Sequence, residues 1–396
     1  MASNVSRGPS HWPELDHLRF LAVMLMVVNH VAVESPVFHA SRVVGAIGFL
    51  GGFAPVLFFF ATGVGYGVQS VSRAAPHGRG YLVKVAILVA CDLDFLTFIG
   101  LSMLVLEWVR KARRSGLVAL SLALALIVGR YAVGPMLPVG SGARVWGVWV
   151  EYLLGTAVIP ALGYAVSPWM AYPLLGFAVG RIAVRHPGAT EKRARLAFGL
   201  ITLAGPFVGL ALVLGSRGAY FFRYGTMSAA YFLSSVAVVL VGLAVVLWLA
   251  RVRAFPGLVG LFTLSGIRSF AVVPLHYWLL WLVSTALGSA HAVGSFFGTA
   301  LAVLVLSVAG SALVVSAAGA VDSPGRRRVA WVAVIGLVVA YHLWIKGWVV
   351  GPSLLFARTA LQLSLCVLLA LHRPSAVRPS PRQFSEPRTR SEPVSA

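Results

Sequence analysis

The sequence has few charged residues, and acidic residues are the scarcest of them. Only 11% of its 396 residues are charged and 59% are apolar, whereas about a quarter of the residues of a soluble domain are charged. This excludes an ordinary soluble protein and predicts a polytopic membrane protein. The 32 Lys and Arg exceed the 11 Asp and Glu, but they lie in short clusters between apolar runs. Such clusters are typical of cytoplasmic loops rather than of a nucleic-acid surface, so no nucleic-acid partner is expected.

Cysteine and the common catalytic motifs are also scarce or missing. Cys91 and Cys366 lie in or beside apolar runs without metal-like spacing, which excludes a disulfide framework and a zinc site, and no metal is expected. The chain has no glycine-rich nucleotide loop, no zinc-protease motif, no serine-hydrolase motif and no convincing internal repeat. Any chemistry must therefore come from polar residues within the membrane spans.

Apolar runs of about 20 residues, the helix length that crosses a bilayer, recur along the chain. We interpret 81–109 as two short helices that meet at Asp92 and Asp94, and 146–165 as a re-entrant or interfacial segment. The expected fold is all-α, a polytopic transmembrane helix bundle of about 10–12 spans. The runs that predict it are 15–35, 46–70, 115–134, 168–185, 196–214, 229–250, 262–288, 292–317, 329–349 and 353–371.

The basic clusters predict the orientation of this bundle in the cell membrane. All of them can be cytoplasmic if both termini are cytoplasmic and 81–109 crosses twice. Residues 1–14 are then a cytoplasmic N-terminus, 15–371 the transmembrane domain, and 372–396 a disordered cytoplasmic tail rich in Pro, Ser and Arg. The first span is expected to be a retained signal anchor. The clusters lie at 73–84, 110–114, 181–195, 251–253 and 326–328.

The first apolar run carries charge at both ends. Arg19 and His30 are eleven residues apart, so in a helix they project from nearly the same face about 16 Å apart along the axis. Asp16 precedes Arg19 by three residues and Glu34 follows His30 by four, which gives each a possible partner. These groups either cap the two ends of a short span or face a cavity. The apolar stretch between them is too short to cross a bilayer, which favours the cavity.

This stretch, "ELDHLRFLAVMLMVVNH", resembles the opening of the acyltransferase-3 family, in which an arginine and a histidine of the first helix are separated by ten residues. The run "GGFAPVLFFFATGVGYG" at 51–67 resembles the next signature of that family. Three further segments resemble the related heparan-glucosaminide N-acetyltransferase-like proteins: "MAYPLLGFAVGR", "FRYGTMSAAYFL" and "LSGIRSFAVVPLHYWLL". Phe20 and Thr62 depart from the usual Gly and Ser of the pattern, which bears on the subfamily.

The resemblance implies an acyltransferase that moves an acyl group, usually acetyl, from cytosolic acyl-coenzyme A to an extracytoplasmic glycan or lipid-linked acceptor. His30 would be the base that takes the proton of the acceptor, with Glu34 as its orienting group. An acyl-histidine intermediate is the alternative role for His30. Arg19 would hold the phosphates of the donor, positioned by Asp16; snorkelling or a structural pair with Asp16 is the alternative.

Asp92, Asp94 and His276 complete the candidate residues, as contacts for the acceptor. Each has a structural alternative: a solvated helix junction for the two aspartates, and a hydrogen bond to a neighbouring helix for His276. A transporter or flippase of a polar substrate, or an assembly partner without chemistry, would also place charges inside a many-helix bundle. The oligomeric state stays open, and a homo-oligomer is compatible with the sequence, because apolar faces for lipid and for another subunit look alike.

Overall fold

The computed structural model describes most of the predicted membrane domain. It covers residues 13–72, 79–134, 153, 164–185, 190–216, 227–249, 264, 266–287, 292–321, 323–349 and 351–371. Within these residues the regular structure is helical and contains no strand, which confirms the all-α prediction. Residues 1–12, most of the predicted re-entrant segment 146–165 and the tail 372–396 lie outside the described part.

Eight of the described helical segments are long and apolar enough to cross a membrane, which supports a multi-pass membrane protein. Two further apolar helices are shorter, and the count of 10–12 crossings stays a prediction. The elements are α1 (Pro13–Glu34), η1 (Pro36–Phe38), α2 (Arg42–Gly51), α3 (Ala54–Ser72), α4 (Arg79–Ala90), α5 (Asp94–Arg110), α6 (Ser115–Val128), η2 (Gly129–Val133), α8 (Val166–Trp169), α9 (Ala171–Arg185), α10 (Thr190–Ser216), α11 (Ala229–Leu249), α13 (Gly266–Leu287), α14 (Val293–Ala320), α15 (Pro324–Ala340), η4 (Tyr341–Ile345), α16 (Lys346–Trp348) and α17 (Pro352–Leu371).

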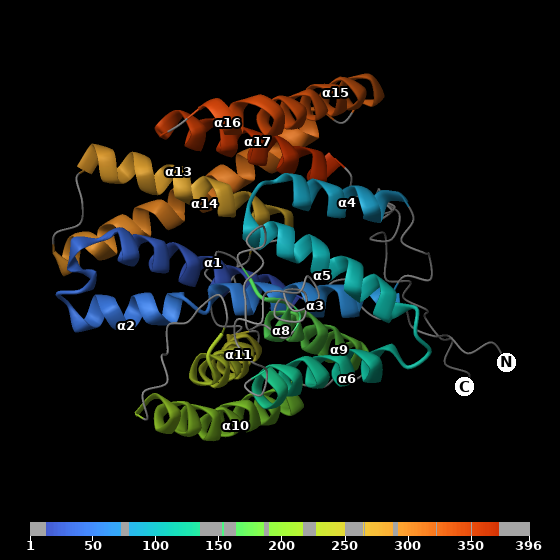
Figure 1. Cartoon of the computed structure of the whole chain (residues 1–396), viewed down its shortest axis with the longest axis vertical. Helices are drawn as coiled ribbons and strands as arrows, with labels where there is room; N and C mark the ends of the chain where they lie inside the picture. Colours follow the sequence, from blue (N-terminus) through green and yellow to red (C-terminus); the bar gives the residue numbers. More distant parts are fainter. Residues whose placement is uncertain are drawn as a thin grey trace, which may run out of the picture.

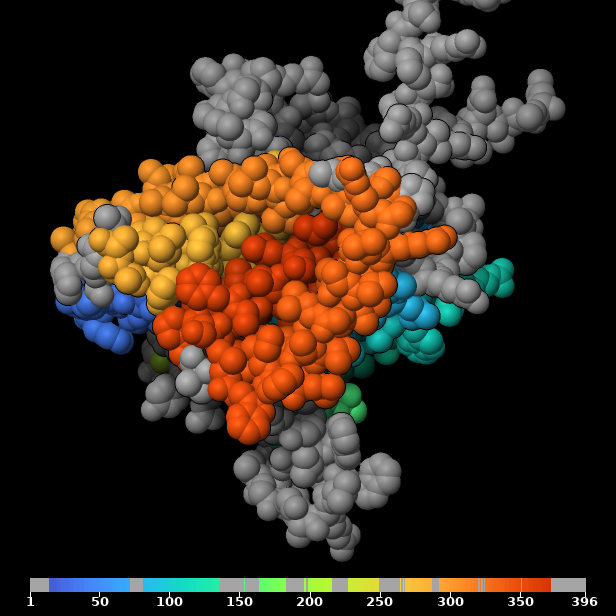
Figure 2. All heavy atoms as spheres, turned by 90° about the horizontal axis from the view of Figure 1, so that it is seen from above, coloured from blue at the N-terminus to red at the C-terminus, as the bar shows by residue number. Residues whose placement is uncertain are grey.

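The helices α1 and α3 lie in the middle of the bundle (Figure 1). On one side of them pack α13, α14 and then α15 and α17, and on the other side α9, α6, α11 and α10 (Figure 1). Figure 2 shows the outer face formed by α13, α14, α15 and α17. This face is apolar, with Leu313 72% and Val332 73% exposed, as expected for helices that contact lipid.

Side-chain contacts show which helices run in the same direction. The start of α1 lies beside Gly65 and its far half beside Gly51, so α2 and α3 return antiparallel to α1. Gly266 of α13 lies beside Arg19, and His276 lies beside His30, so α13 runs parallel to α1. We call the end of the bundle at which α1 begins the basic pole, and the end at which α1 finishes the cavity pole.

The described members of the basic clusters gather at the basic pole, at the end of α5, the end of α9 and the start of α15. Arg181 donates to Ser70 Oγ at 3.5 Å, and Arg110 donates to both carboxylate oxygens of Glu107 at 2.9 and 2.7 Å. The arrangement is the one that the positive-inside rule requires of a single membrane side. Which side this is, and hence the orientation of the termini, stays a prediction.

The predicted division of 81–109 is confirmed: α4 ends at Ala90 and α5 begins at Asp94. Asp92 in the connection adopts φ 50°, a left-handed conformation that aspartate tolerates better than most residues. The helix α4 has 12 residues and is therefore about 18 Å long. Since α4 starts at the basic pole, its connection to α5 lies deeper than the ends of the full-length helices.

The helices α3 and α9 approach so closely that only glycine fits at their contact. A Cβ atom on Gly176 would lie 2.1 Å from the carbonyl oxygen of Phe60, and one on Gly63 would lie 2.0 Å from that of Pro173. Gly67 and Gly180, four residues further along each helix, make equally close contacts with backbone atoms. Two helices with glycine at every fourth position pack in this way in membranes, where close backbone contact replaces the hydrophobic driving force.

Replacement of Gly176 by alanine is expected to lower the thermal unfolding midpoint of the detergent-purified protein. The added methyl group forces α3 and α9 apart, which costs about 1–3 kcal/mol for an overpacked contact. Gly209→Ala is the matched control, since a Cβ atom at Gly209 in α10 meets nothing within 4 Å. Equal midpoints for the two variants would contradict this account of the α3 and α9 contact.

Candidate functional site

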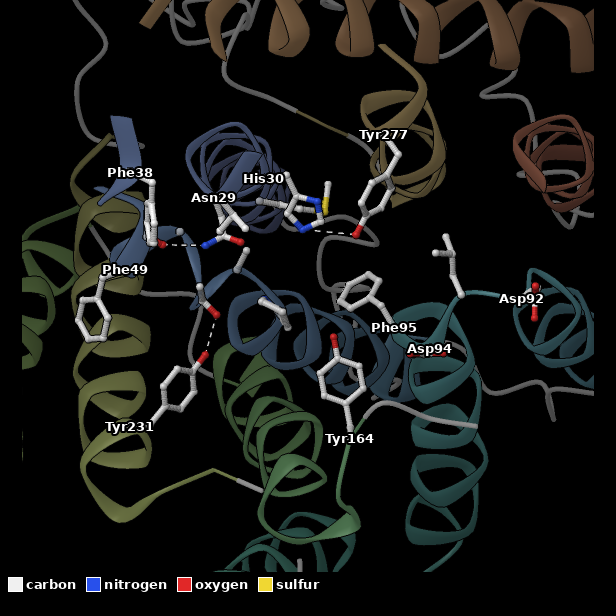
Figure 3. A pocket seen from close by; sticks show the side chains of 18 of the residues that line it. Asn29, His30, Phe38, Phe49, Asp92, Asp94, Phe95, Tyr164, Tyr231 and Tyr277 are labelled. Carbon is white, nitrogen blue, oxygen red and sulfur yellow. Dashed lines mark hydrogen bonds between the residues drawn. The ribbon is translucent and has the colours of Figure 1, made fainter. Parts of the chain in front are cut away.

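A cavity of about 550 Å³ opens at the cavity pole, between α1, the break that separates α2 from α3, the start of α5, α11, α13 and α17. Many of the side chains in its wall are aromatic, polar or charged (Figure 3). Such a concave site with few convergent polar groups is the usual form of a small-molecule site. The polar side chains of the wall that bear on its chemistry are His30, Asp92, Asp94, Tyr231, Tyr277 and Arg358.

The break between α2 and α3 forms one wall of the cavity and is held by two side chains. Asn29 Nδ2 donates to the carbonyl oxygen of Gly48 at 2.7 Å, and the Tyr231 hydroxyl donates to that of Gly52 at 2.6 Å (Figure 3). A Cβ atom on Gly51 would lie 2.6 Å from the Asn29 Cβ. Asn29 therefore joins α1 to α2 and does not end α1, which continues to Glu34.

His30 lies in the cavity wall and contacts two consecutive residues of α13. Its Nδ1 is 3.3 Å from His276 Nε2. Its Nε2 is 3.3 Å from the Tyr277 hydroxyl (Figure 3). His276 is fully buried, and its Nδ1 lies 3.2 Å from the carbonyl oxygen of Val272. Hydrogen-bond distances thus link three groups in a row: His30, His276 and the carbonyl of Val272.

The carbonyl of Val272 fixes the protons along this chain when both imidazoles are neutral. A carbonyl only accepts, so His276 Nδ1 must carry its proton and His276 Nε2 must be an acceptor. His30 Nδ1 then donates to His276 Nε2, which leaves the lone pair of His30 Nε2 unprotonated at the cavity. The second ring nitrogen sets the tautomer of the first. Hydrogen-bond logic therefore makes His30 Nε2 a proton acceptor, to which the Tyr277 hydroxyl donates.

Arg19 lies at the other end of α1, near the basic pole. Its Nη1 donates to Asp16 Oδ1 at 2.7 Å, so the pair expected from the three-residue spacing forms. Cβ atoms on Gly65 and Gly266 would lie 3.1 and 3.5 Å from the guanidinium group of Arg19, and neither glycine places a side chain over it. The other N–H groups of Arg19 lie in the plane of the guanidinium group, a geometry that allows paired donation to the oxygens of a phosphate. Arg19 and His30 both face α13, as the eleven-residue spacing predicts.

The cavity does not extend as far as Arg19 among the described residues. Along α1 its wall includes Val33, His30, Asn29 and Met26. Between Met26 and Arg19, about two helical turns, Ala22 and Val23 are fully buried. The two ends of the candidate site are therefore separated by packed helix in this structure.

The remaining predicted residues are placed differently from one another. Asp94 is exposed in the first turn of α5 and faces the cavity. Asp92 also lines it, but its carboxylate accepts from Lys346 at 2.5 Å and from Tyr341 at 2.9 Å. His276 touches His30 from behind and is not part of the cavity wall. Glu34 is exposed at the end of α1, and none of the hydrogen bonds of the described residues joins it to His30.

Sequence reasoning missed Tyr231, Tyr277 and Arg358. Arg358 had a clear signal, because it is the single charged residue in the apolar run 353–371, and charged residues within a span are functional candidates. Tyr277 follows His276 directly, but no local sequence pattern predicts that its hydroxyl also contacts His30. The Tyr231 hydroxyl donates to a backbone carbonyl 179 residues away in the chain. No local sequence pattern predicts such a contact.

Ring nitrogen chemical shifts of ¹⁵N-histidine-labelled protein are expected to show His30 with its proton on Nδ1 and an unprotonated Nε2. The signal is assigned by its loss in His30→Ala. In His276→Phe the Nδ1 proton of His30 loses its acceptor, so both tautomers should appear. A wild-type protein with the proton on Nε2 would overturn the deduced hydrogen-bond chain.

No protein-family model, no curated protein and no solved structure matches this chain. The resemblance to the acyltransferase-3 family is therefore a prediction that depends on the spacing of Arg19 and His30 and on the four shorter segments of similar sequence. The function must be argued from the residues and their geometry.

Proposed function

We propose that the protein is an integral membrane acyltransferase of the acyltransferase-3 type. It moves an acyl group, acetyl by preference, from acyl-coenzyme A at the basic pole to a hydroxyl or amine of a glycan or lipid-linked acceptor in the cavity. The observation that carries the proposal is the contact of His30 with His276 at the wall of a cavity of about 550 Å³, from which an unprotonated Nε2 is deduced. A neutral imidazole with this orientation can accept the proton of a bound hydroxyl.

In the proposed reaction the acceptor hydroxyl replaces the Tyr277 hydroxyl as the donor to His30 Nε2. Its proton passes to Nε2 as its oxygen bonds to the thioester carbonyl carbon. The carbon–sulfur bond then breaks, and the thiolate of coenzyme A leaves and takes up the proton. His276 stabilises the resulting imidazolium by accepting from Nδ1, the role that a carboxylate has in a serine-protease triad. Direct transfer and an acyl-histidine intermediate both use these groups.

On the donor side, Arg19 is proposed to bind the phosphates of acyl-coenzyme A, with Asp16 fixing the direction of its guanidinium group. The proposal identifies the basic pole as cytoplasmic, in keeping with the positive-inside rule. Because Ala22 and Val23 are packed between Arg19 and the cavity, it requires α1 and its neighbours to part along these two turns when the donor is bound. Acyl-coenzyme A is a substrate in this scheme, and no metal is assigned a role.

A transporter or flippase would use the same buried groups to pass a polar substrate. The two classes differ in the fate of a labelled acyl group, because an acyltransferase forms a covalent product and a transporter does not. Acetyl-coenzyme A with a labelled acetyl group, added to membrane vesicles, should label the glycan or lipid fraction only if the protein is an acyltransferase.

His30→Ala is expected to lower this label transfer by at least about 100-fold, since a general base contributes about 10²–10⁴-fold. His39→Ala is the matched control, because His39 is exposed at the same pole and does not line the cavity. The measurement is the initial rate of label incorporation, normalised to folded protein. A His30→Ala variant that folds and transfers label at the wild-type rate would refute the catalytic assignment.

The basic pole is expected to face the cytoplasm. Cys91 and Cys366 are both buried, so the wild-type protein provides a low background for a membrane-impermeant thiol reagent. Lys111→Cys at the basic pole should be protected in intact cells and react after permeabilisation, whereas His39→Cys should react in intact cells. The reverse pattern would place the donor site on the wrong side of the membrane and rule out the proposed direction of transfer.

A further inference from the structure

Arg358 is a cation in the cavity wall that has no carboxylate partner among the described residues. It lies in the second turn of α17 and is partly buried. In the part of the chain that the structure describes, no carboxylate lies within salt-bridge distance of it. It lies close enough to Tyr277 and Tyr341 to interact electrostatically with both phenol groups. A partly buried arginine without an ion pair is costly, so binding of an anion to Arg358 would be favourable.

The acidic groups of the same cavity do not neutralise Arg358. Asp92 is occupied by Lys346 and Tyr341. Asp94 lines the cavity but forms no ion pair with Arg358. Within the described residues, the cavity thus keeps one positive and one negative side chain that form no ion pair with each other. This combination of charges discriminates against a uniformly apolar or uniformly cationic ligand.

We propose that Arg358 binds an anionic group, a carboxylate or a phosphate, of the acceptor, and so selects acidic glycans over neutral ones. The inference depends on the proposed function for the identity of the bound molecule as an acceptor. The guanidinium group presents paired N–H donors that match the two oxygens of a carboxylate or phosphate. Asp94, which lines the same cavity, accepts hydroxyl or ammonium protons of the same molecule.

The position of Arg358 relative to the base supports this assignment. Tyr277 shares the cavity with both groups: its hydroxyl is 3.3 Å from His30 Nε2, and Tyr277 and Arg358 line the same cavity. An acid group bound by Arg358 would therefore occupy the same cavity as the base. A sugar held there by its acid group would place a hydroxyl at Nε2, where its proton is removed. Arg358 is a specificity-determining residue in this scheme and takes no part in proton transfer.

The test measures binding without catalysis. Detergent-purified protein is titrated with three probes: a disaccharide that contains glucuronate, the same disaccharide with glucose in its place, and glucose 1-phosphate. The readout is the rise in the unfolding midpoint with probe concentration, which gives a dissociation constant. In wild type the acidic probes should bind at least tenfold more tightly than the neutral one.

Arg358→Gln should remove this preference and leave binding of the neutral disaccharide unchanged. Arg358→Lys should keep part of it, because lysine retains the charge without the paired donors. Arg42→Gln is the matched control, since Arg42 is exposed at the same pole and does not line the cavity. If Arg358→Gln does not fold, the comparison of Arg358→Lys with wild type decides, with a several-fold loss of preference expected.

The outcomes separate this inference from the proposed function. Tighter binding of glucuronate identifies a carboxylate as the anion, and tighter binding of glucose 1-phosphate identifies a phosphate; both support the inference. Equal affinities for acidic and neutral probes, or a preference that survives Arg358→Gln, overturn it even if His30-dependent label transfer is observed. An Arg358-dependent preference without any label transfer refutes the acyltransferase but leaves the anion site in place.

Discussion

The parallel packing of α1 against α13 is the contact on which the candidate site depends. It is fixed at the basic pole, where Arg19 lies beside Gly266 and Leu264 N donates to the Asp16 carbonyl at 3.2 Å. It is fixed again at the cavity pole, where His30 meets His276 and Tyr277. A slide by one residue moves a helix by 1.5 Å and turns the contacting face by 100°. Both contacts would then be lost together, so one packing register sets the two ends of the site.

Much of the fold could be predicted because the relevant signals are local. Apolar runs of membrane length predict helices directly, and the charged pair Asp92 and Asp94 in "CDLD" predicts the break between α4 and α5. The eleven-residue spacing predicts that Arg19 and His30 face the same neighbour, because helical periodicity is a property of the backbone alone. The break at Gly52 was not predicted: 46–70 reads as one apolar run, and only the structure shows that α2 ends at Gly51 and α3 begins at Ala54.

The partners of His30 could not be predicted, because they lie 246 and 247 residues away in the chain. Sequence spacing points to Glu34, one turn further along the same helix, and that residue is exposed at the helix end. A neighbouring helix supplies a closer partner, since the interior of a bundle leaves few polar groups unpaired. The charge of Arg358 within an apolar run was visible in the sequence. Nothing local, however, connects α17 to a cavity formed mainly by α1, the break between α2 and α3, and the start of α5.

The short length of α4 also affects the lipid bilayer around the protein. At about 18 Å it is shorter than the hydrocarbon core of about 30 Å, and Leu82 and Val89 on its surface are exposed. The segment η4 covers part of the difference, since His342 Nε2 lies 3.3 Å from the carbonyl oxygen of Ala90, and thinned lipid or water covers the rest. The polar connection that holds Asp92 and Asp94 lies at this step. The hydration of the site thus depends on membrane thickness. A thicker bilayer would bring hydrocarbon into contact with these carboxylates, and a thinner one would leave them hydrated.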